Sequence, residues 1–156
     1  MSDELSNDDI ARILDAIDVI EACLKRLADT RNAVDRADYK TDRDTQAMVE
    51  RRFVKMTEAA LDIGAVLIVH ECGDPPESNP KTMQKLEECG ILPAENAAKM
   101  TDAARFRNIL AHTYGRSIDH DLVYNALQDL ARYRDFATAI RDYLDETESL
   151  DAGMDN

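Results

Sequence analysis

Apolar side chains recur at steps of three and four residues through most of this chain of 156 residues, and this spacing is what most restricts its fold. Such steps place side chains on one face of an α-helix, whereas a half-buried strand would alternate apolar and polar residues. With only 5 Gly and 4 Pro, the chain also has few residues that interrupt helices. We therefore expect an all-α protein. The first apolar stripe consists of Ile10, Ile13, Leu14, Ile17, Ile20, Leu24, Leu27 and Val34.

Capping and turn residues divide the pattern into four long helices and a short one. Ser6 with Asp9 resembles a capping box, Gly73 and Gly90 follow helix ends, and Pro93 opens a helix. We expect residues 1–146 to form one antiparallel helical bundle, and the acidic residues 147–156 to be a disordered tail. The expected helices span about residues 6–38, 43–70, 80–89, 93–113 and 119–146.

The three cysteines, Cys23, Cys72 and Cys89, are odd in number and lack the spacing of metal ligands. We expect all three to be reduced thiols. The N-terminus has no secretory signal pattern, and the longest apolar run is too short to cross a bilayer. These features predict a soluble, cytoplasmic protein that does not associate with membranes.

The net charge of −13 comes from 21 Asp and 11 Glu against 19 Lys and Arg. An excess of Asp over Glu with little Lys is typical of proteins from salt-loving archaea, although an ordinary acidic cytosolic protein would fit as well. High salt screens the self-repulsion of such a surface. Long-range attraction of nucleic acid is not expected, so any RNA contact needs a local cationic patch.

The segment from Arg107 to Tyr114 carries an arginine, an imidazole and a phenol within about two helical turns. His112 is the one histidine of three with such polar neighbours. On an ideal helix, Arg107 and His112 lie roughly 140° apart. They converge only if the arginine folds over, if the helix loosens before Gly115, or if a two-fold dimer brings both chains' residues into one cleft.

These groups fit the cleavage of RNA by its own 2′-hydroxyl. That reaction needs a base for the hydroxyl proton, an acid for the leaving 5′-oxygen, and a cation for the phosphorane oxygens. Imidazole suits the first two roles and arginine the third, without a metal or another cofactor. Two His112 side chains across a dyad would supply acid and base together. The alternative is structural, because an arginine and a histidine near a helix C-terminus also favour the helix dipole.

The segment ARFRNILAHTYG (104–115), followed by LVYNAL (122–127), strongly resembles the HepT-like branch of the HEPN superfamily. The stretches 49–70 and 75–93 resemble the same family, so the likeness covers about residues 8–145. This resemblance implies a helical homodimer that acts as a metal-independent endoribonuclease. It also implies a toxin whose antitoxin is a minimal nucleotidyltransferase of the MntA-like kind.

Carried over to this chain, the family motif falls on Arg107, Asn108, His112 and Tyr114. The resemblance implies that Arg107 holds the scissile phosphate and that His112 serves as base or acid. Asn108 would orient the phosphate or the imidazole. Tyr114 would accept AMP groups from the antitoxin, and the added charge and bulk would block RNA. Without the resemblance, a capping or packing phenol is the simpler interpretation of Tyr114.

Further cations and histidines are weaker candidates. Lys99, Arg105 and Arg116 are candidate RNA contacts, or simply part of a solvated charged face. We expect His70 to bond a carbonyl at its helix end, and His120 to be a solvated residue with a supporting role left open. Two other functions also stay open. One is a non-catalytic HEPN subunit that presents a substrate to a nucleotidyltransferase, and the other is a purely structural four-helix dimer.

Overall fold

The structure is a computed structural model that describes residues 5–113 and 118–154. Within these ranges every regular element is an α-helix, which confirms the predicted all-α class. None of the described helices combines the length and apolar character needed to cross a membrane. The helices are α1 (Asn7–Ala33), α2 (Arg36–Tyr39), α3 (Arg43–Glu71), α4 (Lys81–Glu88), α5 (Ala94–His112), α6 (His120–Leu127) and α7 (Ala131–Met154).

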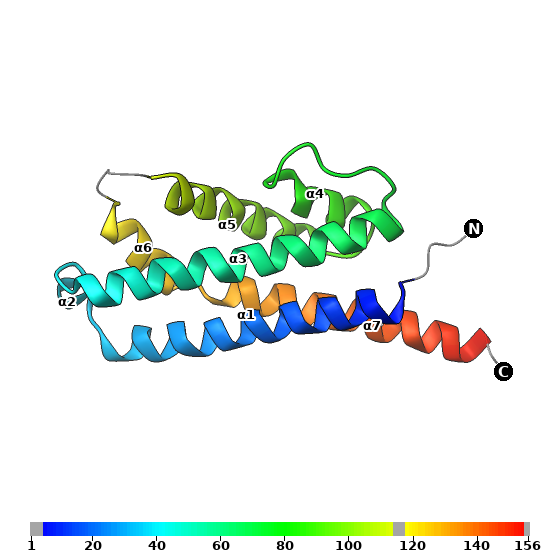
Figure 1. Ribbon diagram of the computed structural model, residues 1–156, viewed down its shortest axis with the longest axis horizontal. Helices are drawn as coiled ribbons and strands as arrows, with labels where there is room; N and C mark the ends of the chain where they lie inside the picture. Colours follow the sequence, from blue (N-terminus) through cyan, green and yellow to red (C-terminus); the bar gives the residue numbers. More distant parts are fainter. Residues whose placement is uncertain (1–4, 114–117, 155–156) are drawn as a thin grey trace.

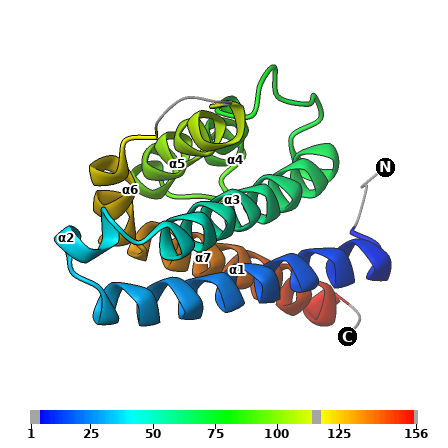
Figure 2. The ribbon, with the colours of Figure 1, turned by 60° about the vertical axis from the view of Figure 1, so that its left-hand side comes forward.

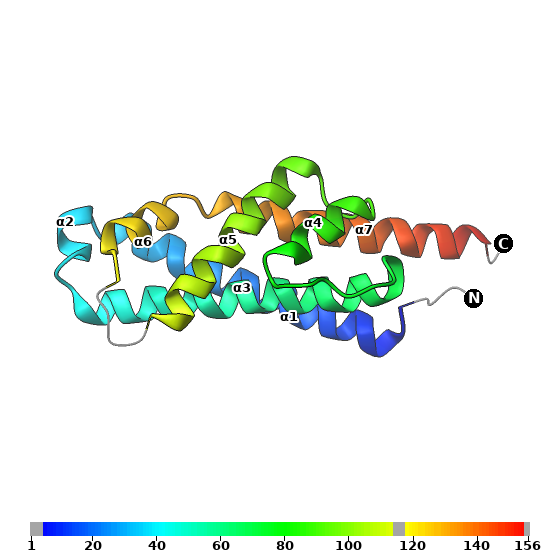
Figure 3. The ribbon, with the colours of Figure 1, turned by 90° about the horizontal axis from the view of Figure 1, so that it is seen from above.

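Each long helix runs roughly antiparallel to the long helix before it, as the sequence predicts (Figure 1). The chain goes out along α1, returns along α3, crosses back over α3 as α5, and returns a second time along α7 (Figures 2 and 3). The short α4 covers one end of the bundle, against α3 and α5, while α2 and α6 lie at the opposite end. The largest fully buried side chains are Tyr39, Tyr133, Phe53, Phe136, Ile13, Ile17, Ile20, Leu27, Met56, Ile63, Leu67 and Ile68.

Local caps set most helix starts where the sequence places them. The Ser6 hydroxyl accepts from the Asp9 N–H at 3.0 Å, and Asp9 accepts from the Ser6 N–H at 3.3 Å, so the capping box is complete. The hydrogen bonds with Ser6 are the main reason that the pKa of Asp9 lies below its usual value. Asp119 likewise accepts from two backbone N–H groups and opens α6. Such caps satisfy donors that a helix start leaves unpaired.

Two helix boundaries differ from the prediction. The expected last helix is broken after Gln128 into α6 and α7, although its apolar spacing continues without a gap. The N–H groups of Gln128 and Asp129 bond three residues back, which tightens the end of α6. The short helix α2 was not predicted; it begins at an Asp35 cap and buries Tyr39. Periodicity alone cannot detect either feature, because both depend on what each short helix packs against.

The residues that were expected to form a disordered tail, 147–156, begin within α7 as the structure describes it. Helix α7 continues to Met154, and the Thr147 hydroxyl donates to the Tyr143 carbonyl at 2.9 Å. Residues 146–152 contain neither Gly nor Pro and include strong helix formers such as Glu and Leu. The helix therefore continues from the buried part of α7 without a signal that would stop it.

The prediction of three reduced thiols is wrong. Cys72 and Cys89 form a disulfide, with Cα atoms 5.8 Å apart, while Cys23 is a buried free thiol. Cys72 is the C-cap of α3 and Cys89 the C-cap of α4. The intervening loop folds back so that these two helix ends meet, and a spacing of 17 residues in sequence does not reveal that contact.

Candidate functional site

Helix α5 carries Arg107, Asn108 and His112, and its packing decides which of them faces the bundle. Met100, Ala103 and Ala104 are fully buried against the core. Phe106 packs edge-on against Phe53 of α3, with ring centroids 5.3 Å apart. Because side chains three and four residues apart share a helix face, Arg107 lies one turn beyond these core positions. Its side chain is therefore mostly covered, with 18 % exposed.

Arg107 is held by two neighbours at its terminal nitrogens. Its Nη2 donates to Glu58 Oε1 of α3 at 2.6 Å, and its Nη1 donates to Asn108 Oδ1 at 3.2 Å. Glu58 is half exposed, at 49 % of its side chain. The buried Nε of Arg107 has no hydrogen-bond partner among the described residues. Asn108 thus accepts a hydrogen bond from the guanidinium, a contact that the family resemblance did not imply.

His112 is the last residue of α5 and is exposed to solvent. Helix α5 stays α-helical through His112, so it does not loosen between Arg107 and His112. The Thr113 hydroxyl caps this end by donating to the Ile109 carbonyl. Within the described parts of the chain, the contacts of Arg107 lead to Glu58 and Asn108, not to His112. A single chain therefore carries the Arg107 guanidinium and the His112 imidazole on α5 without a hydrogen bond between them in the described structure.

The expected RNA-contacting cations have acidic neighbours on the same helix. Lys99 Nζ lies 3.5 Å from Glu95 Oε1, and Arg105 Nη1 lies 3.5 Å from Asp102 Oδ1. All four side chains are at least half exposed. Solvated pairs of this kind are weak and easily exchanged. Tyr114 and Arg116, the remaining predicted site residues, lie outside the described residues.

His120 is less exposed than predicted, at 31 % of its side chain. Its Nδ1 lies 4.0 Å from Glu50 Oε2 of α3, and its ring stands edge-on to Tyr39 at 6.3 Å between centroids. Burial raises the pKa of Glu50, and the nearby His120 opposes that shift. His70, which was expected to bond a carbonyl, places its Nε2 2.9 Å from Asp9 Oδ2.

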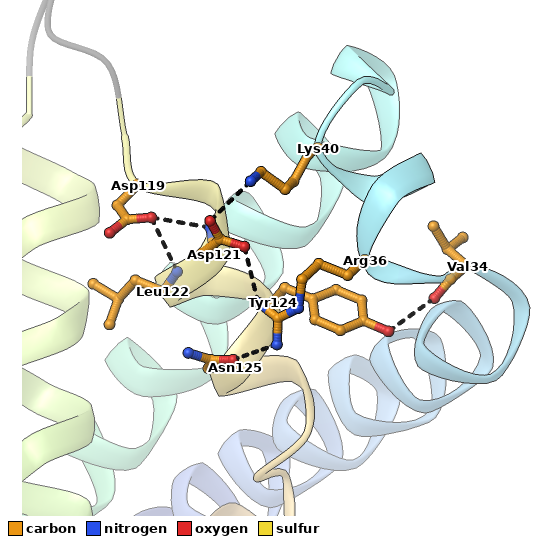
Figure 4. Close-up of polar contacts among 8 residues, drawn as sticks. All are labelled: Val34, Arg36, Lys40, Asp119, Asp121, Leu122, Tyr124 and Asn125. Atoms are coloured by element: carbon orange, nitrogen blue, oxygen red, sulfur yellow. Dashed lines mark hydrogen bonds and ion pairs between the residues drawn. The ribbon is translucent and has the colours of Figure 1, made fainter.

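A network of polar contacts fixes α6, the helix that begins beyond the undescribed segment 114–117 (Figure 4). Arg36 of α2 donates to Asp121 Oδ1 at 2.9 Å and to Asn125 Oδ1 at 2.7 Å. Lys40 donates to the second oxygen of Asp121 at 2.9 Å. The Arg36 guanidinium also lies 4.7 Å from the ring centre of Tyr124. These contacts anchor one flank of the motif to the corner between α1 and α3.

Glu58 is the site residue that sequence reasoning missed. It lies 49 residues from Arg107 in sequence, so no local spacing points to it. Glu58 also borders a groove of about 310 Å³ between α1 and α3, together with Arg12, Lys55 and Asp62. Among the residues that the structure describes, no three His, Cys, Asp or Glu side chains are grouped as a metal site would require. The described groups at this site include a hydrogen-bonded guanidinium and an exposed imidazole.

Solved structures share this fold. The tri-AMPylated HEPN toxin of Shewanella oneidensis, solved in complex with its MNT antitoxin, aligns with a TM-score of 0.76 at 22 % identity. That alignment covers 84 % of this chain and 97 % of the toxin. The cytosolic protein YutE of Bacillus subtilis aligns with a TM-score of 0.75 at 20 % identity, over 90 % of this chain and 92 % of YutE.

Sequence comparison gives the family. A provisionally named RNase of Archaeoglobus fulgidus is 32 % identical over 92 residues, which are 58 % of this chain and 68 % of that protein. The family model described as ribonuclease HepT-like matches residues 20–141, which include α3, α5 and the motif. This match extends over well more than half of the chain. The protein therefore belongs to the ribonuclease HepT-like family.

Proposed function

We propose that this protein is a metal-independent endoribonuclease and the toxin of a toxin–antitoxin pair. The observation that carries the proposal is the family match over residues 20–141, which contains both Arg107 and His112. The site chemistry supports it: Arg107 is held rigidly at its terminal nitrogens, and His112 is open to solvent. A fixed cation and an accessible imidazole are what phosphodiester cleavage needs.

In the proposed reaction the 2′-oxygen of RNA attacks the adjacent phosphorus, and the bond from phosphorus to the 5′-oxygen breaks. The His112 of one chain takes the 2′-hydroxyl proton. The protonated His112 of a second chain gives a proton to the leaving 5′-oxygen. The products are a 2′,3′-cyclic phosphate and a free 5′-hydroxyl. Arg107 binds the non-bridging oxygens, whose charge grows in the transition state.

We propose that two chains form this site about a two-fold axis. A single chain offers one motif histidine, whereas the reaction needs an acid and a base. Two large apolar side chains are exposed on the helices that carry His112 and follow it: Ile109, at 50 %, on the His112 face of α5, and Leu122, at 42 %, on α6. An isologous contact across them would bring both copies of His112 to one cleft.

Ile109→Asp should therefore convert a dimer into a monomer, as measured by light scattering after size exclusion. Val69→Asp is the matched control, because Val69 is 58 % exposed on α3, near the opposite end of the bundle from the motif. A dimer that persists in Ile109→Asp, or that is lost equally in Val69→Asp, would argue against this interface.

The nuclease proposal is tested by incubating total RNA with the wild type and with His112→Ala, in EDTA, at low and at molar KCl. We expect the wild type to cut and the variant to lose about 10²- to 10⁴-fold in rate while staying folded. Undiminished cutting by His112→Ala would refute the role of the imidazole. No cutting by a folded, unmodified wild type would instead favour a non-catalytic subunit of a nucleotidyltransferase.

We propose that the partner is a minimal nucleotidyltransferase antitoxin that transfers AMP from ATP to Tyr114. The Shewanella oneidensis structure, described as a tri-AMPylated HEPN toxin with an MNT antitoxin, supports this partner class. Incubation with such an enzyme and ATP should add the mass of one or more AMP groups to the wild type. Tyr114→Phe should gain none; equal labelling of that variant would overturn the assignment.

A further inference from the structure

Among the described residues, Glu58 is the one side chain from outside α5 that forms a hydrogen bond with the motif arginine. Its carboxylate accepts from Arg107 Nη2 at 2.6 Å, a short distance for a charge-assisted hydrogen bond. Glu58 comes from α3, the long helix on which α5 packs. The buried Phe53 and Phe106 rings fix these two helices against each other beside the pair. The carboxylate is therefore presented to Arg107 from a rigid support.

We infer that Glu58 is a positioning residue for Arg107, one that fixes the guanidinium plane toward the scissile phosphate. This inference rests on the proposed nuclease function and adds a residue to it. An arginine has five N–H donors. In Arg107, Glu58 accepts one of them from Nη2 and Asn108 accepts one from Nη1. One N–H on each terminal nitrogen stays unused and remains for phosphate oxygens, whereas the Nε–H is buried. Holding both ends of the guanidinium before the substrate arrives is the preorganisation on which transition-state stabilisation depends.

The charge of Glu58 has an opposite effect on substrate binding. A carboxylate beside Arg107 cancels the local positive charge and repels an incoming phosphate in the ground state. Glu58 therefore weakens RNA binding while it improves the orientation of Arg107 for the transition state. Its removal has a kinetic signature: kcat falls, whereas KM stays the same or falls. Loss of an ordinary RNA-binding residue would raise KM instead.

The pair is not needed to hold the fold together. Glu58 is 49 % exposed, and half-exposed ion pairs contribute little to stability. The large buried apolar core lies between the same helices and is independent of this pair. Glu58→Gln should therefore fold, so its kinetics can be read directly.

The test compares Glu58→Gln with Glu21→Gln. Glu21 of α1 pairs with Arg141 of α7, and its side chain is 45 % exposed, so it matches Glu58 in chemistry and exposure but lies outside α3 and α5. On a fluorogenic RNA oligonucleotide, Glu58→Gln should lower kcat at least tenfold without raising KM. Glu21→Gln should stay within twofold of the wild type. Glu58→Asp, which keeps the charge on a shorter stem, should recover part of the lost kcat.

A double-mutant cycle shows whether Glu58 acts through Arg107. In an Arg107→Lys background, Glu58→Gln should change kcat less than twofold, because the guanidinium group that Glu58 positions is absent. If Glu58→Gln cuts as fast as the wild type, or costs the same factor in both backgrounds, the positioning role is wrong while the nuclease proposal stands. An inactive wild type would overturn both.

Discussion

At the scale of single residues, Arg107 and His112 differ in how they are held. Arg107 is a partly covered side chain tied to Glu58 and Asn108, whereas His112 is exposed at the end of α5. Their sequence spacing correctly indicates different sides of α5, but it does not indicate which side meets α3. That choice follows from the buried Ala103 and Phe106, which turn Arg107 toward the neighbouring helix.

Gly64 shows at the same scale how closely α4 approaches α3. A Cβ built at Gly64 would lie 2.5 Å from Cγ2 of Thr82, which is itself buried at 3 % exposure. Gly64→Ala should therefore lower the free energy of unfolding by about 1–3 kcal/mol through overpacking. Urea denaturation of purified protein measures this change.

The neighbouring threonine provides the control. Thr82→Ser removes the clashing methyl group, so Gly64→Ala in that background should instead be neutral or stabilise by up to about 1 kcal/mol through helix propensity. The same loss of stability in both backgrounds would mean that Thr82 is not what excludes a side chain at Gly64.

At the scale of elements, the disulfide joins the C-terminal ends of α3 and α4. Protein purified without reductant should therefore bind one alkylating group when unfolded, at Cys23, and three after reduction, as counted by intact mass. Closing a loop with a sequence separation of 17 is worth roughly 3 kcal/mol, so reduction should lower the free energy of unfolding by about that amount. Three alkylated thiols without reductant would show that the bond does not form.

The contact between α2 and α6 depends on ionised Asp121. The hydrogen bond from Lys40, and to a lesser extent the one from Arg36, lowers the pKa of Asp121 from its usual 3.8. The folded state thus favours the charged form, so the stabilisation is complete above about pH 3.8 and is lost as pH falls through the lower folded pKa. Asp121→Asn should lower Tm at pH 7, and the difference from the wild type should shrink toward pH 2.

Asp145→Asn provides the comparison for this pH series. Asp145 is exposed on α7 and takes no part in the ion pairs of the described residues. Its replacement should leave Tm almost unchanged across the same pH range. A loss of Tm in Asp121→Asn that persists undiminished at pH 2 would show that the effect does not come from the ion pairs.

At the scale of the whole molecule, the net charge of −13 opposes the compact state. Salt screens this repulsion, with a Debye length of about 10 Å at 0.1 M that falls to about 3 Å at 1 M. Raising KCl from 0.1 to 2 M should therefore increase Tm by several degrees, as followed by circular dichroism. Sorbitol at equal osmolality controls for general exclusion effects. A Tm that falls, or that rises no more than in sorbitol, would contradict this account.

The sequence alone predicts the helical class, the antiparallel order and most of the helix boundaries. Those properties depend on local physics: the apolar spacing along α1, the capping box of Ser6, and the positive φ of Gly73 and Gly90 at helix ends. It also placed the motif on α5, because Pro93 and the family pattern mark that helix.

Other features depend on how the helices pack in three dimensions. The partnership of Glu58 with Arg107, the disulfide of Cys72 with Cys89, and the break between α6 and α7 all join or separate segments through packing. Local periodicity carries no information about which residue of one helix lies opposite which residue of another. That choice depends on how the buried faces fit together, and it places a carboxylate from α3 against the motif arginine of α5.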